Sequence, residues 1–137
     1  MSDAVQPAPV VPDPTPTSQP FWDALAEGRV ELQHCRSCSG WVYYPRSRCS
    51  HCLSEDLAWE EISGEGTLYT FTVARQPTTP AFSETENLLI AVVELDEGPH
   101  VTTSLEQVAI EDVVAGMRVK PCFVPTDGVT LLRYQPA

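Results

Sequence analysis

The sequence predicts a mainly β protein, in which an N-terminal helix precedes a small cysteine-rich ribbon and a five-stranded barrel. Three observations support this fold class. Four of the five cysteines form two Cys-x-x-Cys pairs within residues 35–52. Five short runs rich in β-branched and aromatic residues follow between residues 66 and 135. Hydrophobic residues make up 42% of the 137-residue chain, which is enough to form a core, so the chain as a whole is not disordered.

The charge and hydropathy of the chain exclude several classes of partner. Lys and Arg number 8 against 19 Asp and Glu, a net charge of −11. Non-specific nucleic-acid binders carry surplus basic residues to displace counterions, so we expect no nucleic-acid partner. The longest mostly apolar run, residues 88–93, is far shorter than the roughly 20 residues of a membrane span, so we expect no membrane partner. The N-terminus has no basic start followed by an apolar block, which predicts a cytoplasmic protein.

The first 20 residues contain six of the 13 prolines. Proline fixes φ and removes a backbone donor, so residues 1–19 are predicted to be a flexible tail or linker. The alternative is that this stretch is the remnant of an interdomain linker, which would make the chain the C-terminal part of a longer protein. We assign residues 20–63 to the helix and ribbon, and residues 64–137 to the barrel.

A short helix is predicted after the proline-rich stretch. Ser18 can cap it, Pro20 suits its first turn, and Gly28 is a natural stop. Phe21 and Leu25 are four residues apart and share one face, which should pack on the segments C-terminal to the helix. The other possibility is that Phe21 and the neighbouring tryptophan dock onto a partner protein.

The cysteine spacing predicts a metal site. Each Cys-x-x-Cys presents two thiolates on one side of the chain, and the ten residues between the pairs allow a strand to run out and back. Four sulfurs at the corners of a tetrahedron suit one structural Zn²⁺ and leave no open position for water, as in a rubredoxin-like zinc ribbon. Redox cysteines would need a thioredoxin-like βαβ setting, which the sequence does not predict. The expected ligands are Cys35, Cys38, Cys49 and Cys52.

Other polar residues of the ribbon are open to two interpretations. Residues 29–48 carry four arginines against one glutamate, a pattern that suits either an anionic partner patch or ordinary pairing with the acidic remainder. His34 and His51 flank the cysteine pairs and are expected to be exposed rather than to ligate. Cys122 is expected to be a buried free thiol.

The second half of the chain predicts a small closed Greek-key barrel of the OB type. Five strands and one helical turn, at residues 110–117, provide its elements, and Thr126-Asp127-Gly128 is a hairpin-type turn. The run at residues 88–95 is apolar enough to be a fully buried strand. The predicted strands are residues 66–75, 88–95, 100–107, 117–124 and 129–135.

Taken in order, these elements resemble the zinc-ribbon plus OB-fold family once filed as domain of unknown function thirty-five. The resemblance covers about residues 20–137. Its most specific pieces are Pro45-Arg46 before the second cysteine pair and the Ser-Gly-Glu-Gly step at residues 63–66. The chain departs from the family pattern at two places. Tyr43-Tyr44-Pro45 stands where the family often has two prolines, and Ser39 stands where glycine is common. The segments that carry it are FWDALAEGRVELQHCRSC, WVYYPRSRCSHC, EISGEGTLYTFTV, LLIAVVELDEG and VTLLRYQPA.

The resemblance implies a non-catalytic accessory subunit of a thiolase-like, CoA-dependent enzyme. Some members accompany a thiolase in acyl-CoA condensation or thiolysis. Others accompany a thiolase-like aldolase that shortens steroid side chains by retro-aldol cleavage of a CoA thioester, and there the domain can be the C-terminal part of a hydratase-like chain. The proline-rich residues 1–20 match the linker of such a chain, which makes the aldolase the leading hypothesis. The resemblance further implies a heterotetramer of two plus two, with the CoA thioester bound mainly by the partner.

Three elements are candidates for contact with the partner or the acyl-CoA. They are the first helix, the ribbon arginines and the proline-interrupted segment 76–87, which is long for a hairpin loop. The residues concerned are Phe21, Trp22, Arg36, Arg46, Arg48, Pro80 and Phe82.

Parts of the sequence are also compatible with a nucleic-acid-binding module or with an enzyme. In a nucleic-acid-binding OB module, Tyr69 and Phe71 would stack bases, but the barrel half has few basic residues, and an aromatic pair at i, i+2 on one face is more typical of a core. If the chain were itself an enzyme, Asp96, Glu97 and His100 would be the acid–base candidates, although a solvated turn accounts for them equally simply. We expect no catalytic residue in this chain.

Overall fold

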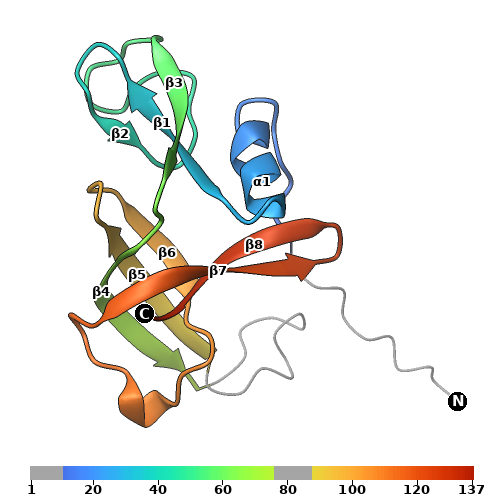
Figure 1. Ribbon diagram of the computed structural model, residues 1–137, viewed down its shortest axis with the longest axis vertical. Coiled ribbons are helices and arrows are strands. Elements are labelled where there is room, and N and C mark those ends of the chain that lie inside the picture. The colour runs from blue at the N-terminus through green and yellow to red at the C-terminus, as the bar shows by residue number, and fades with distance from the viewer. Residues whose placement is uncertain (1–10, 76–87) are drawn as a thin grey trace, which may run out of the picture.

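Two antiparallel sheets and one α-helix make up the part of the chain that the computed structural model describes, residues 11–75 and 88–137. The first sheet has the order β2-β1-β3 and forms the ribbon; the second has the order β6-β5-β4-β7-β8 and forms the barrel lobe (Figure 1). No helix within these residues is long and apolar enough to cross a membrane. The elements are α1 (Gln19–Ala26), β1 (Val30–Cys35), β2 (Trp41–Val42), β3 (Leu57–Ile62), β4 (Gly66–Ala74), β5 (Leu88–Leu95), β6 (His100–Ser104), the 3₁₀ turn η2 (Ile110–Asp112), β7 (Arg118–Thr126) and β8 (Val129–Pro136).

Helix α1 ends as predicted, at Gly28. This glycine has φ +76°, and its N–H bonds to the carbonyl of Leu25 at 3.0 Å. The next N–H, of Arg29, bonds to the carbonyl of Ala24 at 2.9 Å. The two bonds form a Schellman motif, which satisfies carbonyls that the helix end would otherwise leave unpaired.

The start of α1 differs from the prediction. Ser18 is the N-cap residue, but its side chain makes no capping bond to the helix. Its backbone lies in the helical region, with φ −91° and ψ −9°, instead of the extended region that side-chain capping requires. The Ser18 hydroxyl instead accepts a hydrogen bond from the N–H of Thr15 at 2.9 Å.

The ribbon is organised around β1. All six residues of β1 pair with β3, from Val30 opposite Ile62 to Cys35 opposite Leu57. Strand β2 has only two residues, and it pairs with β1 on the other edge. The expectation of a strand pair within the ten residues between the cysteine pairs is therefore wrong. The chain after β2 is held by a side chain of β1 rather than by strand pairing.

The barrel lobe is an open sheet whose edges meet at one place. Closure as a complete barrel, which the sequence predicted, is not found in the described residues. The chain directly after β6 meets β8 in an isolated parallel bridge, between Leu105 and Tyr134. The predicted strand 100–107 ends at Ser104, and Gln107 takes a positive φ of 54° that turns the chain away. A side chain helps to bridge the edges, because the Thr103 hydroxyl donates to the carbonyl of Leu132 at 2.9 Å.

Two expectations about side-chain direction are corrected by the strand register. Strand β5 was expected to be fully buried, but its residues alternate between the core and the surface. Phe71 and Tyr69 do not share a face, because a register shift between Leu68 and Thr70 makes Tyr69 the extra residue of a β-bulge. Phe71 packs against the core, whereas Tyr69 is 59% exposed.

The hairpin at the end of the barrel matches the prediction. Thr126 pairs with Val129, and the two residues between them, Asp127 and Gly128, have φ +48° and +85°. Positive φ at both central positions is the type I′ geometry, whose twist matches that of the flanking strands.

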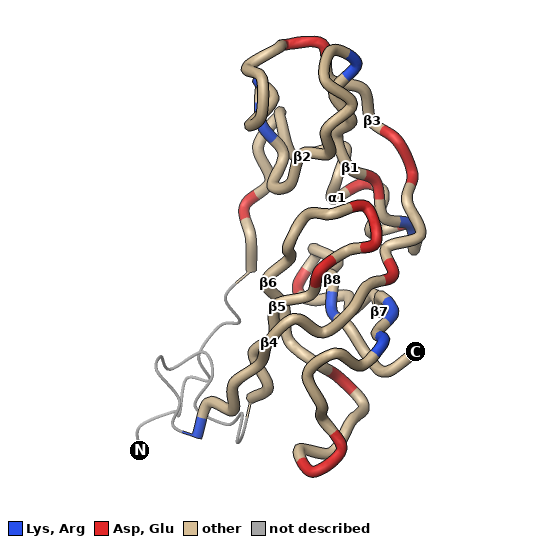
Figure 2. Tube along the Cα trace, turned by 90° about the vertical axis from the view of Figure 1, so that its left-hand side faces the viewer, with Lys and Arg blue, Asp and Glu red and all other residues tan. Residues whose placement is uncertain are grey.

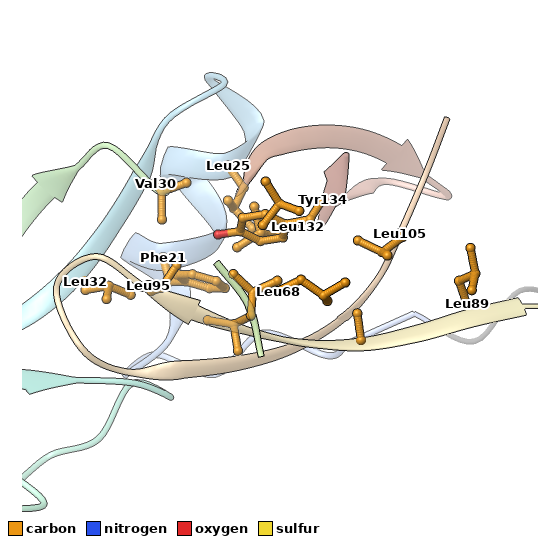
Figure 3. Close-up of a cluster of buried hydrophobic side chains, with 14 of the residues drawn as sticks. Phe21, Leu25, Val30, Leu32, Leu68, Leu89, Leu95, Leu105, Leu132 and Tyr134 are labelled. Atoms are coloured by element: carbon orange, nitrogen blue, oxygen red, sulfur yellow. The ribbon is translucent and has the colours of Figure 1, made fainter. Parts of the chain in front are cut away.

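One hydrophobic core joins the helix, the start of the ribbon and the barrel. Figure 3 shows Phe21 and Leu25 of α1 beside Leu132 and Tyr134 of β8. Val30 belongs to the same cluster, although it lies in the ribbon sheet. The division into residues 1–19, 20–63 and 64–137 therefore remains a sequence prediction, and the core extends across its second boundary. Residues 1–10 and the segment 76–87, which contains Pro80 and Phe82, lie outside the described residues.

The Ser-Gly-Glu-Gly step is explained by close packing between ribbon and barrel. Gly64 has φ +75°, and a Cβ there would lie 2.9 Å from a methyl group of Val30. A Cβ on Gly66 would lie 2.4 Å from the carbonyl oxygen of Glu94. The buried Tyr134 hydroxyl donates to the carbonyl of Gly64 at 2.7 Å. A larger residue at Gly64 would push the ribbon away from the barrel, and one at Gly66 would separate β4 from β5 within the barrel sheet.

This last hydrogen bond gives a test of the junction. Tyr134→Phe should lower the free energy of unfolding by about 1–2 kcal/mol, because the buried carbonyl of Gly64 would lose its donor. Urea denaturation followed by tryptophan fluorescence measures the change. Tyr69→Phe is the matched control, since Tyr69 is exposed, and it should change stability by less than about 0.5 kcal/mol. Equal effects of the two substitutions would contradict the assignment.

Candidate metal centre and partner-facing surface

The four predicted cysteines converge on one point of the ribbon. Their sulfur atoms all lie within 4.8 Å of one another. The Sγ atoms of Cys35 and Cys52 are 3.6 Å apart, and so are those of Cys38 and Cys49. A tetrahedron with Zn–S bonds of about 2.3 Å has sulfur–sulfur edges of about 3.8 Å. The four cysteines therefore fit a structural zinc site.

The two cysteine pairs have the same backbone geometry. Ser39 and Leu53, each directly after the second cysteine of its pair, have φ +64° and +65°. The N–H of Ser39 bonds to the carbonyl of Cys35, and the N–H of Leu53 bonds to that of Cys49, both at 2.9 Å. This repeated left-handed turn explains why glycine is favoured at the position of Ser39. Each turn directs its two sulfurs to the same side.

Backbone amides favour the thiolate form of the first cysteine. The N–H of Cys38 points at the sulfur of Cys35, at 3.5 Å, and donation from this amide lowers the pKa of Cys35 to about 6. At the second pair, the N–H of His51 points at the sulfur of Cys49, at 3.3 Å. Donation to the charged form stabilises it, so these amides favour the deprotonated ligand that zinc requires at the first cysteine of each pair.

The two ribbon histidines do not belong to this cluster. His34 is half-buried rather than exposed: it stacks on Trp41, with ring centroids 4.2 Å apart, and its two ring nitrogens contact Glu60 and the carbonyl of Ser39. His51 is exposed, and its Nε2 donates to the carbonyl of Trp41 at 3.1 Å. Both rings support the first turn from outside, and four sulfurs complete the donor set.

Sequence reasoning missed the residue that positions the second cysteine pair. The side chain of Gln33, only 5% exposed, donates to the carbonyl of Arg46 at 2.7 Å and accepts from its N–H at 2.8 Å. These two hydrogen bonds to the backbone of one residue replace strand pairing and hold the Pro45-Arg46 segment against β1. The signal in the sequence was a polar residue inside an otherwise buried strand, where an unpaired amide would be costly.

The ribbon arginines divide into paired and unpaired side chains. Arg48 contacts Glu55 at 2.8 Å, and Arg36 lies 3.6 Å from Asp56. Arg29 contacts three glutamates of the helix end, β1 and β3. Arg46 is exposed, and its side chain has no ion pair among the described residues. Ordinary pairing thus accounts for three of the four arginines, and Arg46 is the one available to an anionic partner group.

Phe21 and Trp22 lie in an aromatic cluster with Tyr43 and Tyr44. Phe21 is 1% exposed and supports the cluster from the core. It therefore cannot touch a partner or an acyl-CoA directly, and it can affect such a contact only by positioning its aromatic neighbours. Trp22 is half-buried and donates from its indole N–H to the Tyr44 hydroxyl at 3.0 Å.

Beside this aromatic cluster a hollow of about 360 Å³ opens between the edges of β6 and β8, with Arg133 on its border. Burial raises the pKa of Tyr43 to about 12.

Two of the three acid–base candidates are engaged in ion pairs. Asp96 makes a two-point ion pair with Arg118, at 2.8 and 2.9 Å, which lowers the pKa of Asp96. His100 pairs with Glu94 at 3.2 Å.

Cys122 was expected to be buried, but it is half-buried and free, and the partial burial raises the pKa of its thiol.

The cysteine cluster gives a direct prediction. Cys38→Ser should reduce bound zinc from one ion per chain to well below that and unfold the ribbon, since zinc binding to such sites is worth on the order of 10–16 kcal/mol. Mass spectrometric metal analysis and thermal melting measure both effects. Cys122→Ser, which removes a thiol outside the cluster, should retain the metal. Unchanged zinc content and melting in Cys38→Ser would refute the site.

Known proteins share both lobes. Residues 22–58 match the family model of the ChsH2 rubredoxin-like zinc ribbon domain, and residues 59–124 match that of the ChsH2 C-terminal OB-fold domain. The chain is 34% identical over 119 residues to a probable enoyl-CoA hydratase alpha subunit of Thermomonospora curvata, covering 85% of this chain and 37% of that protein. It is 36% identical over 92 residues to a DUF35 domain-containing scaffold protein of Methanocaldococcus jannaschii, covering 65% and 63%. The chain thus spans only part of the length of both relatives.

A solved structure resembles the chain over nearly all of its length. A chain of the Ltp2-ChsH2(DUF35) aldolase superposes with a TM-score of 0.80 at 31% identity, covering 92% of this chain and 98% of that chain. The family models match the ribbon first and the OB-fold sheet second, which is the order of the two lobes in this chain. The chain therefore belongs to the DUF35 family of ChsH2-type proteins, which combine a rubredoxin-like zinc ribbon with an OB-fold domain.

Proposed function

We propose that this chain is a non-catalytic accessory subunit of a thiolase-like, CoA-dependent enzyme, most specifically a retro-aldolase in steroid side-chain degradation. The observation that carries the proposal is its likeness to the ChsH2(DUF35) chain of a solved aldolase, which extends over 98% of that chain. The hydratase-subunit name of one relative supports a CoA-thioester substrate, and the scaffold name of another supports an accessory role.

The side chains support a structural rather than a chemical contribution. Four sulfurs fill a tetrahedral donor set and leave no position for substrate or water. Asp96 and His100, beside the β5–β6 turn, are engaged in ion pairs with Arg118 and Glu94. A retro-aldol step needs a base for the β-hydroxyl proton and a group that stabilises the thioester enolate. In the proposed complex both come from the partner, which also binds most of the CoA thioester.

This chain then contributes surface and rigidity. Trp22, whose indole is held by Tyr44, and Arg46, whose backbone is held by Gln33, lie at defined positions where a partner or an acyl-CoA can meet them. The ion pairs of Arg36 and Arg48 limit their contribution to the edge of such a contact. The proposed assembly has two copies of each subunit, with this chain stabilising the partner and shaping the acyl-CoA site.

The nucleic-acid alternative lacks support from the charge distribution. Over the described residues, Figure 2 shows basic positions scattered among acidic ones on both lobes instead of forming a continuous track. Arg118 is paired with Asp96, and Tyr69, the exposed aromatic of the barrel, lies against His100 rather than in a basic groove. A single-strand groove needs a basic lining along the backbone path.

The direct test is to capture the partner. The tagged full chain is incubated with nuclease-treated lysate of the source cells, and the bound proteins are identified and quantified by mass spectrometry. We expect a thiolase-like protein in near-equal amount, and its reaction with CoA thioesters distinguishes aldol cleavage from the alternative of a thiolase or condensation scaffold. Absence of such a protein, with nucleic acid retained in an untreated sample, would overturn the accessory-subunit role.

Arg46 provides a sharper prediction within the same assay. Arg46→Ala should weaken the complex with the captured partner about tenfold, because its guanidinium has no acidic partner among the described residues of its own chain. Lys120→Ala is the matched control, since Lys120 is also exposed but lies on β7 of the barrel, and it should leave the affinity unchanged. Surface plasmon resonance with the purified partner measures both. An unchanged dissociation constant for Arg46→Ala would remove this residue from the contact.

A further inference from the structure

A cleft separates the ribbon from the turn between β5 and β6. Its volume is about 440 Å³, at the lower end of the range for ligand sites. Trp41, Tyr43 and His51 line it from the ribbon, and Glu97 and His100 line it from the barrel lobe. Figure 1 shows the β5–β6 turn reaching toward the ribbon. The cleft is thus built by two segments far apart in the sequence.

Glu97 is the unusual group in this cleft. Its Oε1 is buried and has no hydrogen-bond partner within the described residues. Removal from water raises the pKa of the Glu97 carboxyl, a hydrogen bond from its own backbone N–H partly offsets this, and the nearby charge of Asp96 adds to the rise. A buried carboxylate oxygen without a donor is costly, and folded proteins seldom retain one without a functional reason.

The neighbouring cations of the chain are already engaged elsewhere. Arg118 gives two hydrogen bonds to Asp96, the residue next to Glu97. The Nε2 of His100 contacts Glu94, and the Nε2 of His51 donates to the carbonyl of Trp41. None of these cations pairs with the Glu97 carboxylate, which leaves it available to a cation from another molecule that enters the cleft.

The lining favours a guanidinium over other cations. A metal ion does not fit the described residues of this cleft. The four cysteines are the one group of possible metal ligands within the described residues, and Glu97 lies outside that group. A guanidinium is planar, donates through a rigid fork that matches a carboxylate, and packs well on aromatic rings, whereas an ammonium is a compact, strongly hydrated charge. Trp41 and Tyr43 supply aromatic surface beside Glu97. The net charge of −11 favours approach of a basic surface.

We propose that this cleft receives an arginine side chain of the partner enzyme, with Glu97 as its counter-ion and Trp41 and Tyr43 as its aromatic wall. The proposal rests on the accessory-subunit function and adds a specific anchor to it. The cleft is separate from the proposed CoA contacts, because a carboxylate repels the phosphates of CoA. Trp22 and Arg46 do not line it.

The first arm of the test uses the zinc-loaded full chain alone. Nα-acetyl-arginine amide is titrated into ¹⁵N-labelled protein, and the indole N–H signal of Trp41 is followed by NMR. We expect saturable binding with a dissociation constant of about 1 mM, and none for the citrulline analogue, which has the same shape without the charge. Glu97→Gln should weaken binding at least about tenfold, whereas Glu94→Gln, on an exposed residue paired with His100, should not. Equal binding of both probes, or binding unaffected by Glu97→Gln, would overturn the proposal.

The second arm separates this proposal from the proposed function. With the captured partner, Glu97→Gln should raise the dissociation constant at least about tenfold, chiefly through faster dissociation, because it leaves a desolvated arginine unpaired. A urea unfolding midpoint equal to that of the parent chain shows that the variant is folded. Normal partner affinity of Glu97→Gln would overturn the arginine anchor while leaving the accessory role intact. Failure to capture any thiolase-like partner would overturn the accessory role and, with it, the partner-arginine anchor, while the first arm would still report on the pocket itself.

Discussion

The open edge of the barrel sheet is the constraint on which the rest of the structure depends. The chain directly after β6 meets β8 at one isolated parallel bridge, so the core between β6 and β8 would be exposed without another element. Helix α1 covers it: Phe21 and Leu25 insert beside Leu132 and Tyr134, and the Tyr43-Tyr44 segment of the ribbon extends the cover (Figure 3). The N-terminal half of the chain is therefore part of the barrel's core, not a separate module beside it.

This shared core explains how a ribbon with almost no interior of its own has a fixed position. Its separate apolar cluster consists of two cysteines and Val42, with Leu57 packed against them. The ribbon is fixed at one end by Val30 and the tight approach of Gly64, and at the other by the four-sulfur cluster. Small domains of this size need a metal or a similar constraint, because they bury too little apolar surface. With both ends fixed, the ribbon can present side chains at defined positions.

Charge pairing then decides which side chains are presented. The chain is strongly acidic, and most of its arginines contact acids of the same lobe, as Arg48 does with Glu55 and Arg118 with Asp96. The exceptions matter for the proposed accessory role, since the cation Arg46 has no ion pair among the described residues and the half-buried carboxylate Glu97 has one oxygen without a donor there. We propose that they are two different places for partner groups. One suits an anion and the other a cation, so a partner that meets both is oriented as well as bound.

The sequence by itself determined the features that depend on local chemistry. The cysteine spacing, the type I′ turn at Asp127-Gly128 and the helix end at Gly28 each follow from a few neighbouring residues, and each agrees with the structure. Only the tertiary structure decided the features that depend on register and on contacts between distant residues. The bulge that turns Tyr69 outward and the unpaired oxygen of Glu97 leave no local signal. The polar Gln33 in β1 is a signal, but it does not reveal the bond to Arg46, because that bond depends on which segments the fold brings together.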